Sequence, residues 1–443
     1  MVNNSDKPFR ILSLDGGGIR GIISALILQQ VEKELEEKGT SLLEHFDMIA
    51  GTSTGSLLAA GVAIGKPIKD LIEMYEKEGE TIFPYHGFWS VFNIVKRAKI
   101  ILKYGLSSPK YDNEGLIKVL KKVLTINGKE VTLKDVGKNE GQEIPKPILL
   151  ILAYDTLYRN TTFFTNYYDR KKARNELPWY LKQPLWKICV SSASAPTFFP
   201  GFELDHEEYL YANYDEKKII KNEKGEEIRT QWSFPHVDGG VTANNPSLCA
   251  IAHALDLGYK LENISLLSIG AGQDTEPYEF KKMRGWGLIG WGTRISNVFM
   301  AGQGELQDRI CKSLMGEEKY LRLQFELNQT VYIKEDIQEG NELYNKMCKE
   351  VLKGQKITPN QDILSALKEF AQKPVIENKY LRKNSLIKKR IDNDMANASL
   401  GNIQVLKEAA VKYINGDKKN ESSEVQKAIK KFIREEVLVT FSK

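Results

Sequence analysis

Residues 46–64 read FDMIAGTSTGSLLAAGVAI. The apolar run Phe46–Ala50 has the length of a short buried strand, and the small-residue stretch Ser56–Ile64 is typical of a packed helix. Between them lies the G-x-S-x-G turn Gly51-Thr52-Ser53-Thr54-Gly55. A turn of this kind between a strand and a helix presents the serine hydroxyl beyond the end of the strand. We therefore predict a strand–turn–helix unit with a reactive serine at its turn.

A second unit of the same kind precedes the first. Phe9–Leu14 reads as a strand, Asp15-Gly16-Gly17-Gly18 breaks it, and apolar residues then recur at helical spacing from Ile19 to Val31. Two such units close together favour βαβ winding. We predict an α/β fold, a three-layer sandwich with a mainly parallel central sheet flanked by helices. Further strands are expected at 147–153, 161–165, 236–238, 264–269 and 320–325, and further helices at 184–195 and 247–257.

Composition and charge are those of a globular protein. The 443 residues are 42% hydrophobic and 27% charged, which excludes disorder as the main state. The net charge of +5 is uneven, because residues 371–443 hold 16 Lys/Arg against 9 Asp/Glu. The cysteines Cys189, Cys249, Cys311 and Cys348 lie far apart, which argues against a disulfide framework or a zinc site. With a polar N-terminus and no long apolar run, we expect a cytoplasmic protein that contacts the inner membrane surface only peripherally.

Ser53 is the predicted nucleophile, and its oxyanion donors are expected on a glycine-rich loop. The loop Gly16-Gly17-Gly18-Ile19-Arg20-Gly21 suits this role, because it follows a strand and opens a helix. The rival interpretation is a dinucleotide phosphate loop, since the letters also fit G-x-G-x-x-G. The acidic residue expected about 20 positions later has no clear candidate, because the glutamates at 32–37 fall on a charged helix face.

A nucleophilic serine needs a base, and the last of the five histidines is His253. His253 falls within an apolar run and is expected to be a satisfied core residue. His236 is the rival base, since it lies on the same strand face as Asp238. Residues so close on one strand would struggle to line up as Asp–His–Ser, which favours a Ser53–Asp238 dyad. A base at neutral pH requires that desolvation raise the pKa of Asp238 above its reference of about 3.9.

At this point the chain resembles patatin-like phospholipases of the bacterial type. The residues that carry the resemblance, over about residues 8–325, are Asp15–Gly21, Gly51–Gly55, Ser194–Pro200 (SAPTFFP), Asp238-Gly239-Gly240 and Asn244-Asn245-Pro246. The resemblance implies that Ser53 is the nucleophile and Asp238 the base, with no histidine, no metal and no cofactor. It implies that Gly17 and Gly18 donate to the oxyanion while Arg20 supports their loop. The motif residues expected to shape these loops are Asp15, Gly16, Gly21, Gly51, Gly55, Gly239 and Gly240.

The family's activity implies a lipid acyl hydrolase of the phospholipase A type, which cleaves fatty acyl esters through an acyl-enzyme. Its partner would be a membrane or micellar lipid, with no nucleic acid polymer. The alternatives are a nucleotide-regulated membrane-degrading effector with the same chemistry, and a non-catalytic lipid-binding protein. Asn245 is expected to cap the helix that opens at Pro246, an architectural role.

We divide the chain into three segments by its motifs and its charge pattern. We expect a catalytic domain at 8–325, a helical insertion or regulatory segment at 326–390, and C-terminal helices at 391–443 that partly complete the core. Two aromatic and basic stretches, 83–104 and 284–294, are candidates for membrane contact, with packed structure as the alternative. The apolar stripe Val425, Ile429, Phe432 and Ile433 favours a terminal helix packed on the core over one lying on a membrane.

Overall fold

A sheet lies at the centre of the computed structural model, which describes residues 7–84, 100–105, 108–138, 144–167, 178–205, 224–225, 233–287, 290–291, 294–334, 386–416 and 422–441. Within these residues the sheet has eight strands, in the order β10-β9-β1-β2-β5-β8-β7, with β6 paired to β5. The strands are β1 (Phe9–Leu14), β2 (Met48–Thr52), β5 (Ile148–Asp155), β6 (Asn160–Thr165), β7 (Phe202–Asp205), β8 (Ser233–Asp238), β9 (Ile264–Ile269) and β10 (Tyr320–Leu323). Two small sheets pair β3 (Thr125–Ile126) with β4 (Lys129–Glu130), and β11 (Thr330–Lys334) with β12 (Leu386–Arg390).

The central strands of this sheet are parallel. Strands β10, β9, β1, β2 and β5 run in one direction, whereas β6, β8 and β7 are antiparallel to their neighbours. A parallel sheet covered on both faces requires continuous apolar strands. Ile148–Leu152 in β5 meets this requirement, with every side chain fully buried. The predicted α/β fold with a mainly parallel sheet is therefore confirmed.

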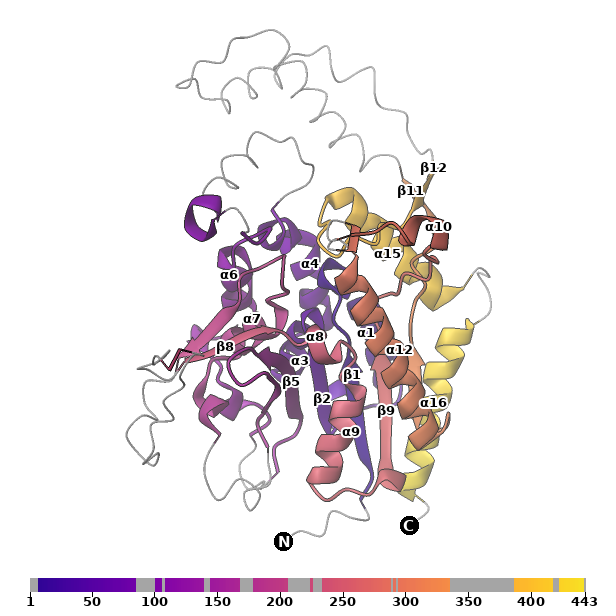
Figure 1. Cartoon of the computed structure of the whole chain (residues 1–443). Coiled ribbons are helices and arrows are strands. Elements are labelled where there is room, and N and C mark those ends of the chain that lie inside the picture. Colours follow the sequence, from indigo (N-terminus) through magenta and orange to yellow (C-terminus); the bar gives the residue numbers. More distant parts are fainter. Residues whose placement is uncertain are drawn as a thin grey trace, which may run out of the picture.

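Helices cover both faces of the sheet (Figure 1). On one face lie α1 (Gly21–Glu36), α3 (Thr54–Ala63), α4 (Ile68–Ile82), α6 (Glu114–Val123), α7 (Leu185–Ala193), α15 (Leu400–Asn415) and α16 (Glu424–Phe441). On the other lie α9 (Ser247–Asp256) and α12 (Ile295–Met315). Alternate residues of a strand point to opposite faces, so Ile11 packs in the α9 core and Leu12 in the α1 core. The short helices and 3₁₀ turns are α2 (Leu42–His45), α8 (Gly240–Ala243), α10 (Phe280–Met283), η1 (Gly18–Arg20), η2 (Leu133–Asp135), η3 (Trp179–Lys182) and η5 (Leu261–Asn263).

The C-terminal helices share the core of α1. Leu406 of α15 and Ile429, Phe432 and Ile433 of α16 are buried in the same apolar cluster as α1. The stripe predicted for the terminal helix is thus packed on the protein, as favoured from the sequence. Among the described helices, none has the length and apolar character needed to cross a membrane.

Two expected features lie largely outside the described residues. The structure describes only 83–84 and 100–104 of the aromatic and basic stretch at 83–104. Of the predicted segment 326–390, it describes 326–334 and 386–390, whose strands β11 and β12 pair with each other. The role predicted for 326–390 therefore stays a prediction.

Strands β2 and β8 approach each other along one edge of β5. The pairing of β2 with β5 ends at Thr52 opposite Leu152, and that of β8 ends at Asp238 opposite Ala153. Strand β6 pairs with both of these β5 residues and so occupies the opposite edge. Because β2 is parallel to β5 and β8 is antiparallel to it, the carboxyl ends of β2 and β8 face one another. This register brings the residue after β2, Ser53, beside the last residue of β8, Asp238.

Candidate active site

Ser53 sits on a strained turn between β2 and α3. Its backbone has φ 54° and ψ −125°, a conformation that L-residues other than glycine rarely adopt. Hydrogen bonds hold the turn, since the Ser53 N–H donates to Ser192 Oγ at 2.9 Å and Ser56 Oγ donates to the Ser53 carbonyl at 2.6 Å. A Cβ on Gly55 would lie 2.1 Å from the Leu14 carbonyl oxygen, so only glycine lets α3 pack this closely against β1. This is the geometry of a nucleophile elbow.

The Ser53 hydroxyl donates to Asp238. The distance from Ser53 Oγ to Asp238 Oδ2 is 2.6 Å, although the two residues are 185 positions apart. The Gly240 N–H donates to the other carboxylate oxygen, Oδ1, at 2.7 Å. Burial raises the pKa of Asp238 to about 6, and these two hydrogen bonds oppose the rise. The structure thus brings together the two residues expected to form a dyad and gives the carboxylate a pKa near neutral pH.

The two candidate histidines have other partners. The ring of His236 contacts Thr162 Oγ1 at 2.9 Å through Nε2 and the Phe234 carbonyl at 2.7 Å through Nδ1. His253 lies within 3.3 Å of Thr165 Oγ1 and 3.1 Å of the Tyr167 carbonyl. Burial lowers the pKa of both imidazoles. His253 is therefore the satisfied core residue expected from the sequence.

The glycine loop presents two backbone N–H groups without a protein partner among the described residues, those of Gly17 and Gly18. The N–H groups on either side are used, because that of Gly16 donates to the Asn244 carbonyl at 3.1 Å and that of Ile19 to the Met395 carbonyl at 2.8 Å. Gly17, Gly18 and Ser53 line the same cavity. Free donors beside a nucleophile are what a developing oxyanion requires.

Arg20 supports this loop from a buried position. Its Nε donates to the Gly17 carbonyl at 3.3 Å, which orients the peptide that carries the Gly18 N–H. Burial lowers the pKa of Arg20 to about 10, and the nearby Asp274 and Asp394 oppose this effect. The guanidinium therefore stays charged at neutral pH.

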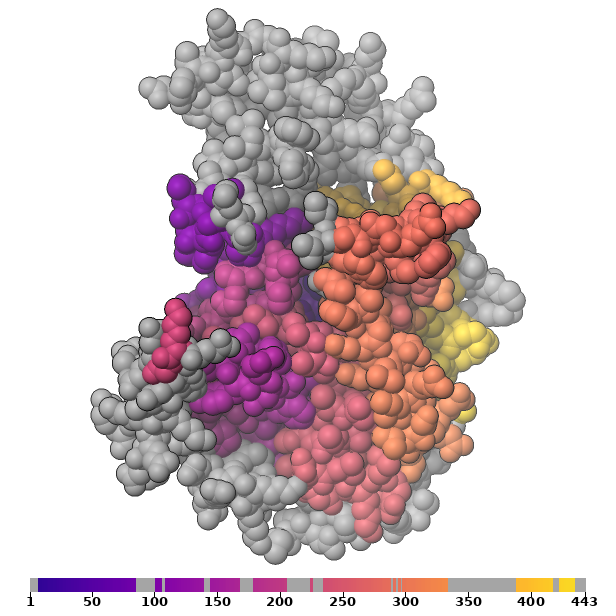
Figure 2. All heavy atoms as spheres, viewed as in Figure 1, coloured from indigo at the N-terminus to yellow at the C-terminus, as the bar shows by residue number. Residues whose placement is uncertain are grey.

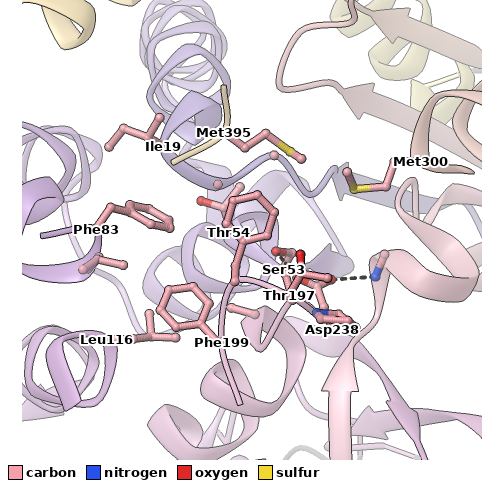
Figure 3. A pocket seen from close by; sticks show the side chains of 18 of the residues that line it. Ile19, Ser53, Thr54, Phe83, Leu116, Thr197, Phe199, Asp238, Met300 and Met395 are labelled. Carbon is pink, nitrogen blue, oxygen red and sulfur yellow. Dashed lines mark hydrogen bonds between the residues drawn. The ribbon is translucent and has the colours of Figure 1, made fainter. Parts of the chain in front are cut away.

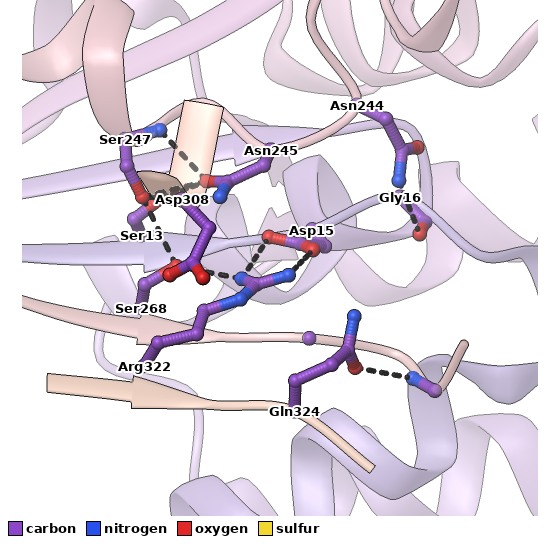
Figure 4. Close-up of polar contacts among 12 residues, drawn as sticks. Ser13, Asp15, Gly16, Asn244, Asn245, Ser247, Ser268, Asp308, Arg322 and Gln324 are labelled. Carbon is purple, nitrogen blue, oxygen red and sulfur yellow. Dashed lines mark hydrogen bonds and ion pairs between the residues drawn. The ribbon is translucent and has the colours of Figure 1, made fainter. Parts of the chain in front are cut away.

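Asp15 anchors the start of the loop through a partner that sequence reasoning missed. Arg322 of β10 donates to both carboxylate oxygens of Asp15, at 2.8 and 2.5 Å, and to Ser268 Oγ at 2.6 Å (Figure 4). Burial alone would lower the pKa of Arg322, but the charge of Asp15 and these hydrogen bonds raise it above its ordinary value. The available signal was a lone arginine within the apolar run YLRLQF at 320–325.

Ser192 was also missed. It is fully buried, accepts from the Ser53 N–H, and donates through Oγ to the Leu152 carbonyl at 2.6 Å. Its own carbonyl accepts from the Gly239 N–H at 3.2 Å. One serine near the end of α7 therefore holds the turns that carry both Ser53 and Asp238.

A cavity of about 290 Å³ opens from Ser53 and is largely apolar. Its walls come from distant segments, namely Ile19, Leu57, Ile82, Phe83, Leu116, Phe199, Phe299, Met300 and Met395. Figure 3 shows Ser53 and Asp238 at one side of this cavity and Phe83 and Leu116 at the other. Helix α12, coloured orange on the outer face in Figure 2, contributes Phe299, which is more than half exposed and also borders the cavity. An apolar cavity ending at a serine suits an aliphatic chain.

Two further expectations from the sequence concern the stretch 284–294 and the start of α9. Trp286 and Trp291, from the glycine-rich stretch 284–294, pack edge to face at 5.3 Å between ring centroids, and Arg294 stacks on Trp286. Helix α9 begins at Ser247 rather than at Pro246, and Asn245 Oδ1 accepts from the Ser247 N–H at 3.0 Å. Among the described residues, no group of three or more His, Cys, Asp or Glu side chains is arranged to hold a metal ion.

The fold and the site together define an α/β protein in which a serine on a nucleophile elbow donates a hydrogen bond to a buried aspartate. The sequence profile of the patatin-like phospholipase family matches residues 12–251, and the chain belongs to this family. Membership of this family supports a lipid ester hydrolase activity for the protein.

Individual relatives extend over most of the chain. Patatin-like protein 1 of Arabidopsis thaliana is 29% identical, over 83% of this chain and 86% of that protein. Patatin-04/09 of Solanum tuberosum is 28% identical, over 86% of this chain and 92% of its own length. A potato relative named probable inactive patatin-3-Kuras 1 is also 28% identical, over 71% of this chain and 78% of that protein. Among solved structures, VipD from Legionella pneumophila aligns over 98% of this chain and 92% of its own, with 12% identity and a TM-score of 0.29.

Proposed function

We propose that this protein is a phospholipase A-type lipid acyl hydrolase that works through a Ser53–Asp238 dyad and an acyl-enzyme. The observation that carries the proposal is the 2.6 Å hydrogen bond from Ser53 Oγ to the buried Asp238 carboxylate beside an apolar cavity. Among the described residues, this carboxylate has no cationic partner. A nucleophilic serine requires an adjacent base, and this contact supplies one without a histidine.

Acylation begins when Ser53 Oγ attacks the ester carbonyl carbon. The hydroxyl proton passes to Asp238 as the bond forms, and the Gly17 and Gly18 N–H groups donate to the oxyanion of the tetrahedral intermediate. When the intermediate collapses, the bond to the alcohol oxygen breaks, and Asp238 returns the proton to that oxygen. The lysolipid leaves, and the acyl chain remains on Ser53.

Deacylation repeats these steps with water. A water molecule attacks the acyl-Ser53 carbonyl and gives its proton to Asp238, and the same N–H groups stabilise the second oxyanion. Collapse breaks the bond to Ser53 Oγ, which recovers the proton, and a fatty acid is released. A carboxyl whose pKa is about 6 can accept and return a proton in both steps near neutral pH.

The substrate class follows from the cavity. Phe83, Leu116 and Phe199 are the kind of side chains that accommodate an acyl chain, and burial of such a chain stabilises the complex by about 0.8 kcal/mol per methylene. The lipid would come from a membrane or micelle that the protein contacts peripherally. We assign the catalytic domain to 8–325 and a completing role to 391–443, an assignment supported by the bond from the Ile19 N–H to Met395.

The test is a product analysis on mixed phospholipid vesicles. Free fatty acids and lysolipids should appear together with wild-type protein and should be absent with Ser53→Ala, which removes the nucleophile but leaves the buried core intact. Equal release by Ser53→Ala, or release of phosphorylated headgroups instead of fatty acids, would refute the proposal.

A further inference from the structure

Asn244 bridges the loop that carries Asp238 and the glycine loop. Asn244 follows α8. Its side-chain Nδ2 donates to the Gly16 carbonyl at 3.3 Å, and its backbone carbonyl accepts from the Gly16 N–H at 3.1 Å (Figure 4). These contacts fix which way the amide faces. Turning it over would set the side-chain oxygen against the Gly16 carbonyl oxygen, two acceptors with no proton between them.

This orientation leaves the other end of the amide unpaired. Asn244 Oδ1 is buried and has no hydrogen-bond partner among the described residues. A buried acceptor without a donor is uncommon in folded proteins and points to a further ligand.

The unpaired oxygen lies close to the base. The position that a Cβ on Gly240 would take is 3.0 Å from Asp238 Oδ1, 3.1 Å from Asn244 Oδ1 and 3.6 Å from Met300 Sδ. The two oxygens therefore border the same small space beside Gly240. A Cβ on Gly16 would lie 2.4 Å from Asn244 Oδ1 and 3.0 Å from the Ser53 Cβ, so the amide oxygen also lies close to the serine.

We propose that Asn244 Oδ1 and Asp238 together hold the water that hydrolyses the acyl-enzyme, an inference that rests on the proposed function. The water donates one hydrogen to each oxygen. As its oxygen bonds to the acyl carbon, the proton facing Asp238 moves to the carboxylate, and the other stays on the new carboxyl group. Cleavage of the bond to Ser53 Oγ then returns the Asp238 proton to that oxygen.

A second cavity lies beside Asn244. It measures about 100 Å³ and is lined by polar groups, including Asn244, Arg20, Asp274 and Gln324. Met300 borders both this cavity and the apolar one. The proposal requires that water pass Met300 from the polar side while an acyl chain fills the apolar side.

The proposal separates the two half-reactions. Acylation uses the hydroxyl of Ser53 itself, which already donates to Asp238 Oδ2. In Asn244→Ala the backbone bond between Gly16 and residue 244 persists, whereas the Gly16 carbonyl, whose peptide carries the Gly17 N–H, loses its Nδ2 donor. Because both half-reactions use that N–H, this loss should slow them by the same factor, and hydrolysis of the acyl-enzyme should slow by a further factor of about 10 to 100.

The experiment measures both rates with a p-nitrophenyl fatty acyl ester in a stopped-flow instrument, and the bound acyl group by mass spectrometry of the quenched protein. Asn244→Ala should show a steady state that is slowed about 10-fold to 100-fold more than the burst, with acyl-Ser53 as the accumulated species. Thr242→Val is the matched control, because this hydroxyl of α8 accepts from Thr161 Oγ1 at 2.9 Å and donates to the Gly239 carbonyl at 3.3 Å, and neither bond involves Asn244. Its two rates should match those of the wild type.

Other outcomes overturn the inference. If Asn244→Ala slows the burst and the steady state by the same factor, the side chain only orients the oxyanion loop; if it slows neither, it holds no water. Should the variant not fold, the smaller substitution Asn244→Ser is read by the same ratio of rates. A wild-type protein whose Ser53 reacts with neither the ester nor a fluorophosphonate would instead refute the proposed function.

Discussion

Two buried aspartates in this site have opposite surroundings. Asp15 and Asp238 each lie at the carboxyl end of the sheet and are almost fully buried. Asp15 receives both arms of the Arg322 guanidinium, whereas Asp238 receives only the Ser53 hydroxyl and the Gly240 N–H. Among the described residues, no cation contacts Asp238.

The difference shows what makes a buried carboxylate a base. Beside Asp15 the guanidinium charge opposes the effect of burial, which still raises the pKa of Asp15, and the pair forms a fixed ionic anchor for the glycine loop. Beside Asp238 only the hydrogen bonds from Ser53 and Gly240, and no cation among the described residues, oppose burial, and its pKa rises to about 6. A carboxyl that can change its protonation state near neutral pH is suited to proton transfer.

The largest expected effect comes from removing the charge of Asp238, the carboxylate that has no cationic partner among the described residues. Asp238→Asn keeps the shape of the side chain but cannot accept the Ser53 proton, so kcat/KM should fall by about 10³-fold. The measurement is the initial rate on a fatty acyl ester. Asp155→Asn, a buried aspartate whose Oδ1 accepts from the Leu157 and Tyr158 N–H groups, is the control and should stay near the wild-type rate. Similar losses in both variants would contradict the assignment.

The paired carboxylate should instead control stability. Arg322→Met leaves the Asp15 charge buried without its partner, which should lower the free energy of unfolding by about 3–5 kcal/mol. Urea unfolding followed by circular dichroism measures this change. The double variant Asp15→Asn with Arg322→Met should recover part of the loss, because no lone charge remains. A single variant as stable as the wild type would show that the ion pair does not anchor the loop.

The pH dependence of stability should report the protonation of Asp238. The folded pKa of Asp238 lies above the unfolded value of 3.8, so the folded state binds the proton more tightly. Its contribution to stability is present at low pH and is lost as pH rises through about 6, a loss of about 3 kcal/mol. The stability of Asp238→Asn relative to the wild type should therefore increase between pH 4 and pH 7. A relative stability that is constant with pH would mean that Asp238 titrates normally.

The smallest expected effect concerns the serine that links both turns. Ser192→Ala leaves the Ser53 N–H without its acceptor and removes one donor from the Leu152 carbonyl in the core, which should cost about 1–3 kcal/mol of stability. The esterase rate should also fall, because the elbow loses a restraint. Ser191→Ala is the matched control, since Ser191 Oγ donates only to the Lys187 carbonyl of its own helix. Thermal melts in which the two variants are equal would exclude this role for Ser192.

Local patterns predicted the strands well where one apolar run makes one strand. Phe9–Leu14 and Ile264–Ile269 were predicted with the bounds that the structure shows. The strand expected at Phe46–Ala50 instead runs from Met48 to Thr52, because Phe46 is the C-cap residue of α2. Its side chain is buried in the core, and hydrophobicity alone does not separate a buried helix end from a strand.

The site was predictable only where its residues lie in motifs. The proximity of Ser53 and Asp238 followed from the G-x-S-x-G turn and the Asp-Gly-Gly strand end. Arg322, Ser192 and Met395 reach the site through strand order and helix packing, which join residues more than a hundred positions apart. No local periodicity carries that information, and the ion pair at Asp15 therefore could not be read from the sequence.

The most direct test of the Ser53–Asp238 dyad is the rate at which a fluorophosphonate labels Ser53 in wild-type, Asp238→Asn and His236→Ala proteins. Labelling follows the attack of Ser53 and does not depend on the identity of the natural lipid. We predict a rate near that of the wild type in His236→Ala and severely slowed labelling in Asp238→Asn. Rapid labelling of Asp238→Asn together with loss of labelling in His236→Ala would contradict the account.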